Sequence, residues 1–227
     1  MLIKFKKEND GLIKLDEKIN SIVFEKVSFG YSDKEIFNNL NLEIKSNLIL
    51  KAKNGFGKSS ILKLLYLLFE IKSGKIKINN IESKNINKLS YRKRVYLNNI
   101  MHYLPNDFLI KILCSENVET MNLFVYNLEK YNLVSILDSC NLSLNKKIED
   151  NGNNLSSGQK QIVNLLVLFT KKFDLVLLDE AFENVSIEIF EQLKLAILDF
   201  QKDAIFIEIS HTNKIINENS PFLTLNW

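Results

Sequence analysis

The apolar positions of this chain form two continuous runs of strand length, at residues 175–178 and 204–209. A stretch with helical spacing, residues 186–200, separates them. Apolar runs without polar alternation are typical of parallel strands whose two faces are both covered by helices. The pattern therefore predicts an α/β protein built on a buried parallel sheet.

Shorter patterns predict the elements around this sheet. Residues 22–24 and 40–44 are strand candidates joined by a polar connection at 35–39, and we expect them to form an antiparallel layer. Between residues 119 and 139, apolar side chains recur at the spacing of helices. Further expected elements are a short strand over 75–79, a partly helical segment over 85–99, a helix opened by 155–159 with apolar residues all round, and a closing strand that packs Phe222 and Leu223.

Composition sets limits on size and location. The chain has 227 residues, of which 46% are hydrophobic and 25% charged, and these values predict one globular domain over residues 1–227. The longest apolar runs are far shorter than the ~20 residues that span a bilayer, and no secretory signal opens the chain, so we expect a cytoplasmic location. Cys114 and Cys140 lack the paired spacing of a metal site and are expected to be buried thiols.

The strongest chemical signal is the stretch AKNGFGKSS at residues 52–60, between the apolar run 48–50 and an apolar helical run at 61–69. A glycine-rich turn between a strand and a helix lets backbone N–H groups and the helix dipole converge on phosphate oxygens. Lys58 is expected to reach the β- and γ-phosphates, and the Ser59 hydroxyl to complete a Mg²⁺ shell. The loop predicts binding of a nucleoside triphosphate, with contacts from Asn54, Gly55, Phe56, Gly57, Lys58, Ser59 and Ser60.

A second group of chemical residues is the carboxylate pair Asp179 and Glu180, directly after the apolar run at 175–178. Ligands of α/β sheets bind beyond the carboxyl ends of the strands. Asp179 is suited to hold Mg²⁺ through water, and Glu180 to polarise a water that attacks the γ-phosphoryl group. Together with Lys58, the pair predicts hydrolysis of the bound nucleotide.

A third motif, Leu155-Ser156-Ser157-Gly158-Gln159, lies between the other two. With it, the order of motifs over nearly the whole chain resembles the ATP-binding cassette (ABC) nucleotide-binding domains, whose signature sequence is LSGGQ. The resemblance implies a phosphate-loop NTPase core with a mixed sheet, an antiparallel β layer and a helical signature subdomain, here roughly residues 106–172. It also implies that signature residues bind the γ-phosphate of ATP held by a second subunit, here Ser156, Ser157, Gly158 and Gln159.

The resemblance assigns further positions. Tyr31 matches an aromatic residue that stacks on adenine, and His211 matches the switch histidine that contacts the γ-phosphate. The family's loop glutamine, which senses Mg²⁺ and the transmembrane partner, is not found; Asn99 and Asn106 are the candidates to replace it. We favour Asn106 because the preceding YLP repeats the family's flanking pattern. As a Mg²⁺ ligand, Asn106 is expected to coordinate weakly or through water, because its side chain is one methylene shorter.

Other positions depart from the family pattern. Ala52 replaces the first glycine of the phosphate loop, and Ser157 replaces the first signature glycine, where a small side chain is expected to fit unless φ is positive. Residues 183–186 read ENVS where the family is usually close to SALD, so cooperation between two sites is expected to be altered. Glu149 and Gly152 resemble the glutamate–glycine loop of exporter-type cassettes.

These inferences predict an ATP-hydrolysing subunit of an ABC transporter, a homo- or heterodimer with export favoured. The resemblance implies that a separate transmembrane partner forms the pore and that the chain is peripheral at the inner face of the cell membrane. Two alternatives stay open: a non-transport ABC ATPase acting on nucleic acid or ribosomes, and a nucleotide-binding regulatory subunit with weak hydrolysis. The net charge of +3, from 30 basic and 27 acidic residues, argues against nucleic acid, which needs clustered basic residues.

Overall fold

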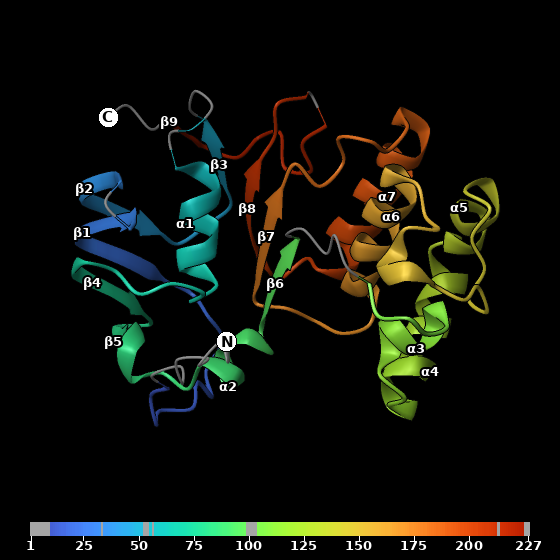
Figure 1. Cartoon of the computed structure of the whole chain (residues 1–227), viewed down its shortest axis with the longest axis horizontal. Coiled ribbons are helices and arrows are strands. Elements are labelled where there is room, and N and C mark those ends of the chain that lie inside the picture. Colours follow the sequence, from blue (N-terminus) through green and yellow to red (C-terminus); the bar gives the residue numbers. More distant parts are fainter. Residues whose placement is uncertain are drawn as a thin grey trace, which may run out of the picture.

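The computed structural model describes residues 10–32, 34–51, 55, 57–98, 104–212 and 214–224, and helix α1 (Lys58–Leu65) lies between two sheets (Figure 1). The antiparallel sheet has the strand order β2-β1-β4-β5 and the parallel sheet the order β6-β7-β8-β3-β9. The first comprises β1 (Ile22–Tyr31), β2 (Lys34–Ile44), β4 (Ser73–Ile78) and β5 (Ile81–Glu82). The second comprises β3 (Leu48–Lys51), β6 (Val95–Asn98), β7 (Leu175–Asp179), β8 (Ile205–Ile209) and β9 (Phe222–Thr224).

The antiparallel layer is present as predicted, but it is larger. Residues 35–39, which we predicted to be a polar connection, belong to β2, so that prediction was wrong. β2 is an edge strand whose outward polar side chains meet solvent, while Phe37 and Leu40 are buried. The strand also shifts register against β1, and Asn39 has a left-handed φ of 53°. A polar, irregular edge strand lacks the strict alternation by which strands are recognised in a sequence.

The parallel sheet contains the two predicted apolar strands. Residues 175–178 and 204–209 fall on β7 and β8, and Leu177 pairs with Ile207. The predicted closing strand forms β9, which pairs with β3. The segment 85–99 holds the short helix α2 (Lys88–Arg92), as expected, and then β6, which we did not predict. β6 was hidden because its four residues follow a basic, polar segment.

Helices cover the other side of the parallel sheet from α1 (Figure 1). They are α3 (Leu109–Cys114), α4 (Val118–Lys130), α5 (Leu133–Ser139), α6 (Ser157–Leu166) and α7 (Ile187–Phe200), with the short 3₁₀ turns η2 (Asp150–Gly152) and η3 (Val167–Phe169). A further 3₁₀ turn, η1 (Ser83–Asn85), follows β5 and contacts β4 of the antiparallel layer. The predicted helices between 119 and 139 are α4 and α5. The helix predicted after residue 155 is α6, but only its second half is largely buried, because its first turn reaches the surface.

Two hydrophobic clusters cover the two faces of the parallel sheet. Leu175 and Leu177 pack with α1 and the antiparallel layer, whereas Val176 and Leu178 pack with the helices of the other side. Successive strand side chains point to opposite faces, so one strand feeds both clusters. Double coverage of the sheet explains why its strands have continuous apolar sequences.

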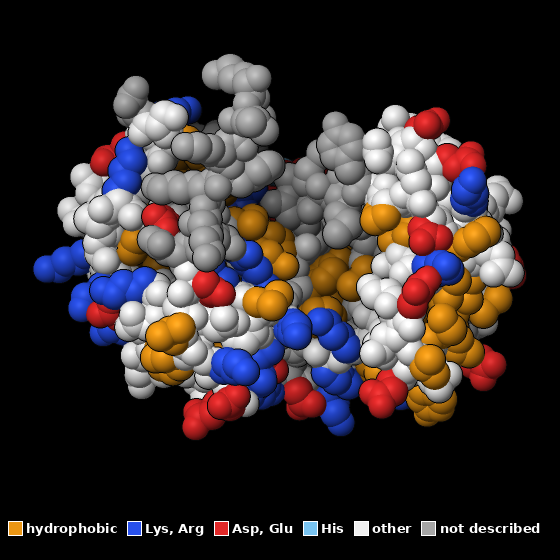
Figure 2. Space-filling view, turned by 60° about the horizontal axis from the view of Figure 1, so that its bottom comes forward, with side chains coloured by type: hydrophobic (Ala, Val, Ile, Leu, Met, Phe, Trp, Pro, Cys, Tyr) orange, Lys and Arg blue, Asp and Glu red, His pale blue; other side chains and the backbone are white. Residues whose placement is uncertain are grey.

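The surface of the helical side carries exposed apolar side chains. On α4, Val118 is 69% exposed and Tyr126 60%. Figure 2 shows hydrophobic side chains gathered on this side, with basic and acidic side chains close by. Exposed apolar area that is rimmed by polar groups often marks a contact with another molecule. Across the described residues, no helix has the length and apolar content needed to cross a membrane.

Candidate functional site

The start of α1 has the backbone geometry of a glycine turn. Gly57, which caps α1, has a φ of 83°, and Gly55 has a φ of 84°, values that L side chains rarely adopt. Lys58, the first residue of α1, is only 7% exposed. The N–H groups in the first turn of a helix have no partner within that helix. Turn and helix together therefore form a place that suits an anion.

The predicted phosphate contacts fall into two groups. Gly55, Gly57, Lys58, Ser59 and Ser60 lie together in this turn and the first turn of α1. Asn54 and Phe56 lie outside the described residues, as do Ala52 and Asn99.

Tyr31, at the end of β1, lies beside the first turn of α1. Its hydroxyl is 3.1 Å from the Ser60 hydroxyl, and either oxygen can donate the hydrogen bond. Its ring packs edge-on against Phe29 and Phe69, with centroids 5.0 and 5.3 Å away. The residue is 37% exposed. The ring is therefore held in place while part of its surface stays open, as stacking on a base requires.

Asp179 and Ser59 meet at the edge of the parallel sheet. β8 lies between β7 and β3, so the carboxyl ends of these parallel strands share one edge. Asp179 ends β7 there, and its carboxylate accepts a hydrogen bond from Ser59. Burial raises the pKa of Asp179, while the Ser59 hydrogen bond and the nearby Lys63 and Lys58 lower it. Two oxygen-bearing side chains from different elements thus lie close to a lysine, as the sequence predicted.

Glu180 contacts His211 in an unusual backbone conformation. Its φ is 52°, in the left-handed region where non-glycine residues are uncommon. Its N–H donates to Ile209 O at 2.9 Å, and its Oε1 lies 3.1 Å from His211 Nε2. Burial raises the pKa of Glu180; His211 lowers it, and Glu183 and Asp179 raise it further. A carboxyl group with a raised pKa, held by a histidine, is suited to general-base chemistry.

The signature residues form the start of α6. Ser156 caps the helix: its hydroxyl accepts from the Gln159 N–H at 3.2 Å, and Gln159 Oε1 accepts from the Ser156 N–H at 2.9 Å. Gln159 Nε2 also donates to Cys140 O at 2.7 Å. Both polar atoms of this side chain are thus engaged within the chain, and a nucleotide contact from Gln159 stays a prediction. Ser157 is not among the described residues with positive φ, so serine fits there without backbone strain.

Gly158 is the position where the signature requires glycine. A Cβ added to it would lie 2.6 Å from Asn184 O, in the turn of residues 181–186. Gln161 holds the same turn, because its Oε1 accepts from the Asn184 N–H at 2.7 Å and its Nε2 donates to Glu180 O at 3.2 Å. We did not predict a role for Gln161, because a polar residue on a helix does not reveal in sequence which loop it binds.

The two parts of the predicted nucleotide site lie on opposite sides of the sheet. The structure brings Ser59, Asp179, Glu180 and His211 together beside Lys58. Figure 1 shows α1 and α6 on either side of β7 and β8, and the apolar residues of the two helices belong to different core clusters. The signature at the start of α6 is therefore separated from α1 within one chain.

Asn106 contacts the segment before the signature. Its Oδ1 accepts from the Asn151 N–H at 2.8 Å, while Leu104 N–H donates to Asn151 O at 3.0 Å. Gly152, which follows, has a φ of 87°, and its N–H donates to Glu149 O at 2.9 Å. These contacts place Asn106 next to the predicted glutamate–glycine loop.

The Mg²⁺ role of Asn106 has no support from its contacts. In the part of the chain that the structure describes, no contact joins Asn106 to Ser59 or Asp179. β6, by contrast, ends at Asn98 opposite Leu178, one residue before Asp179. The position after β6 is Asn99, the alternative that the sequence left open, and it lies outside the described residues.

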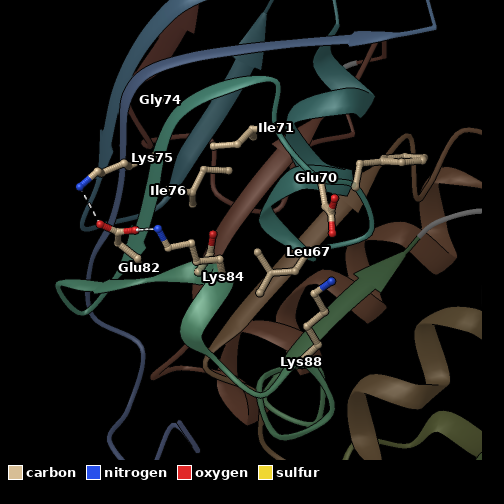
Figure 3. Close-up of a pocket in the computed structure, with 11 residues that line it drawn as sticks. Leu67, Glu70, Ile71, Gly74, Lys75, Ile76, Glu82, Lys84 and Lys88 are labelled. Atoms are coloured by element: carbon tan, nitrogen blue, oxygen red, sulfur yellow. Dashed lines mark ion pairs between the residues drawn. The ribbon is translucent and has the colours of Figure 1, made fainter. Parts of the chain in front are cut away.

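A cavity of about 350 Å³ lies near the other end of α1 (Figure 3). Leu67, Ile71 and Ile76 give it apolar walls. At its rim Glu82 forms ion pairs with Lys75 at 2.7 Å and Lys84 at 2.8 Å. These lysines hold the pKa of the Glu82 carboxyl at about 2. The lining contains none of the predicted nucleotide contacts, so this cavity is separate from the glycine turn.

Comparison with known protein families gives one clear match. The family model described as ABC transporter matches residues 37–183, a range that holds the phosphate loop, the signature and the carboxylate pair. A Haemophilus influenzae protein named "Probable ABC transporter ATP-binding/permease protein" is 27% identical over 201 residues, covering 85% of this chain and 36% of the relative. The microcin-J25 export ATP-binding/permease protein McjD of Escherichia coli is 27% identical over 217 residues, covering 94% of this chain and 37% of the relative.

Comparison with solved structures supports the fold. The structure of a bacterial Atm1-family ABC exporter with ATP bound matches with a TM-score of 0.83 and 21% identity. The match covers 96% of this chain and 38% of the exporter chain. The chain thus spans little more than a third of the length of these three proteins.

Proposed function

The chain belongs to the ABC transporter family, and from this premise we propose that it is the ATP-binding and ATP-hydrolysing subunit of a transporter, with export as its direction. The observation that carries the proposal is the cluster at the end of β7. There Glu180 lies 3.1 Å from His211, and Asp179 accepts a hydrogen bond from Ser59 beside the glycine turn. A candidate base, two oxygen donors and a helix start suited to an anion at one edge of the sheet support this proposal.

The residues at this edge fit Mg·ATP. The N-terminus of α1 and Lys58 suit the phosphates, and Tyr31 suits the adenine. Ser59 and Asp179 offer the oxygen ligands that Mg²⁺ prefers, and the interaction of the two side chains supports a shared site for the ion. When bound, the ion supplies positive charge that neutralises the phosphate oxygens.

Glu180 and His211 perform the proton chemistry in this proposal. The Glu180 carboxylate orients a water and takes its proton as the water oxygen attacks the γ-phosphorus and the bond to the β–γ bridging oxygen breaks. Its raised pKa makes it a better proton acceptor than an ordinary glutamate. His211 fixes the direction of the Glu180 side chain through its Nε2 contact and is placed to contact the γ-phosphate.

The second part of each site comes from another subunit in this proposal. α6 starts on the other side of the sheet from α1, so Ser156 and Gly158 are free to meet a nucleotide held by a second cassette. Two cassettes would then enclose two ATP molecules head to tail, as a homodimer or a heterodimer. Loss of the γ-phosphate contact after hydrolysis lets the dimer open.

Transport requires a membrane partner. The two named relatives are called ATP-binding/permease proteins, and this chain spans 36% and 37% of their lengths. We propose that transmembrane helices of a separate partner complete the transporter and that the cassette works at the inner face of the membrane. The exposed apolar side chains of α4 offer one surface for contact with another subunit.

The test measures ATP binding and ATP turnover in the variant Glu180→Gln. The matched control is Glu191→Gln, on the exposed face of α7. Removing a general base typically lowers kcat by about 10²-fold or more, and we expect that loss with an ATP Kd within about threefold of wild type. Unchanged turnover in Glu180→Gln would contradict the mechanism. ATP binding without turnover in the wild-type chain would favour the alternative, a regulatory subunit with weak hydrolysis.

A further inference from the structure

Lys214, which the proposed mechanism does not use, binds the turn that follows Glu180. Its Nζ donates to Phe182 O at 3.2 Å and also to Val185 O. Phe182 and Val185 are each 3% exposed, whereas Glu183, Asn184 and Ser186 of the same turn are exposed, so the lysine bonds to the two buried residues of its inner side. Buried carbonyl groups need donors, and an ammonium group carries three. One lysine thus donates to two carbonyl oxygens of the turn at residues 181–186, of which Phe182 O also accepts from the Val185 N–H at 3.2 Å.

The lysine joins the two segments that start at the proposed catalytic pair. One segment runs from Glu180 into the turn, and the other runs from His211 to Lys214. The Glu180 and His211 side chains are already in contact at 3.1 Å, and the Lys214 N–H donates to Thr212 Oγ1 at 3.3 Å. Lys214 Nζ closes these contacts into a ring that links the two segments.

The same turn is also held by α6. Asn184 donates to Gln161 through its N–H and lies over Gly158 with its carbonyl oxygen. Gln161 also donates to Glu180 O. The turn is therefore bonded both to Lys214 and to the signature helix, and its position affects both the Glu180 backbone and the start of α6.

We propose that Lys214 is a positioning residue that fixes the turn at 181–186 and, through it, the Glu180 carboxylate and the start of α6. The inference rests on the proposed ATP hydrolysis for its catalytic readout. Lys214 acts on main-chain oxygens of this turn, and we do not propose that it contacts the nucleotide. Its loss is expected to slow the chemical step without weakening ATP binding.

The experiment compares Lys214→Met, which keeps the unbranched stem and removes the donors, with Lys214→Arg and the control Lys202→Met at an exposed site. Misplacement of a reacting group lowers kcat, and we expect about a tenfold loss in Lys214→Met with a KM for ATP within about twofold. Lys214→Arg keeps the donors and is expected to restore at least half of the wild-type kcat. Lys202→Met is expected to match wild type.

A second measurement is independent of turnover. Hydrogen exchange of the amides at 183–185 is expected to be about tenfold faster in Lys214→Met than in wild type, because the turn opens more often. Equal exchange in the two proteins would overturn the proposal, and so would faster exchange with unchanged kcat, since the lysine would then serve only the fold. Absent turnover in wild type would be a failure of the proposed function, and exchange alone would then decide whether Lys214 holds the turn.

Discussion

At the scale of the residue, Gly158 shows how a signature position is fixed by its neighbour. The glycine lies in the first turn of α6, where its backbone conformation suits any residue, and Ser157 before it tolerates a side chain. What requires glycine is Asn184 O, which lies 2.6 Å from the place of a Cβ. The turn at 181–186 and the signature helix therefore depend on each other.

A methyl group at Gly158 is therefore expected to be costly. Gly158→Ala should lower the free energy of unfolding by about 1–3 kcal/mol, because Asn184 or α6 must move. Ser157→Ala, at the exposed neighbouring position, should change it by less than about 0.5 kcal/mol. Urea unfolding of both variants measures the difference. Equal stability of the two variants would show that the turn yields without cost.

Glu208 is a buried carboxyl group on β8. The sequence analysis predicted the apolar run at 204–209 that contains it and gave this residue no role of its own. It is 2% exposed and accepts from the Ile216 N–H at 2.8 Å and the Asn217 N–H at 3.0 Å. Burial raises the pKa of Glu208, and the two N–H groups and Lys194 lower it by less. These hydrogen bonds hold the segment after His211 in place. Burial of the carboxylate in its charged form is nevertheless unfavourable for stability.

The raised pKa predicts a pH dependence of stability. The folded protein binds the Glu208 proton more tightly than the unfolded chain, whose carboxyl group has its ordinary pKa of 4.5. The contribution of this tighter proton binding to the free energy of unfolding is therefore complete below pH 4.5. It is lost as the pH rises from there through the folded pKa. Glu208→Gln lacks this titration.

Unfolding free energies of wild type and Glu208→Gln, measured by urea between about pH 4 and pH 7, test this linkage. Wild type should lose stability relative to the variant as the pH rises, with a slope of at most about 1.4 kcal/mol per pH unit. A difference that stays constant, or that moves in favour of wild type, would show that the folded pKa is not raised.

At the scale of the element, α6 is held at its start by a capping box with an added contact. Gln159 bonds the Ser156 N–H and also Cys140 O, at the end of α5. The side chain thus joins two helices as well as capping one. Its polar atoms are engaged before any nucleotide binds.

This arrangement predicts a structural effect of Gln159→Ala. The variant loses both hydrogen bonds and should be less stable by about 1–2 kcal/mol without ATP. Gln161→Ala in the next turn also removes two bonds, but to the turn at 181–186, and serves as the comparison. Thermal unfolding in the absence of nucleotide measures both. A Gln159→Ala protein as stable as wild type would favour a role in nucleotide binding alone.

Elements differed in how well the sequence predicted them. The β7 and β8 strands were predicted because burial on both faces leaves a continuous apolar run, and α4 and α5 because one face of each is apolar. The first half of β2 was taken for a connection because an exposed edge strand has no such pattern. β6 was missed because its four residues are too few to show a period.

The residues of the candidate site also differed in how well the sequence predicted them. The location of Lys58, Ser59, Asp179 and Glu180 could be predicted, because they stand at fixed places relative to strand ends and helix starts, while their roles stay predictions. His211 was assigned through resemblance, and its contact with Glu180 agrees with a shared site. Gln161 and Lys214 could not be predicted, since their partners are main-chain atoms far along the chain. For Asn106, the structure gives a partner that the sequence did not suggest.

At the scale of the whole molecule, the parallel sheet divides the proposed site into two halves. One core cluster supports α1 and the glycine turn, and the other supports α6 and the signature. A single chain therefore offers a phosphate-binding surface on one side and a signature surface on the other. Two chains placed head to tail would complete both sites, so turnover should depend on how many chains meet.

The most direct test is Mg·ATP hydrolysis by the purified chain over a series of protein concentrations, with Lys58→Ala as the blank. We expect turnover per chain to rise with concentration and to be abolished in the variant, because two chains build each site. Turnover per chain that is independent of concentration, or that persists in Lys58→Ala, would contradict this two-chain site.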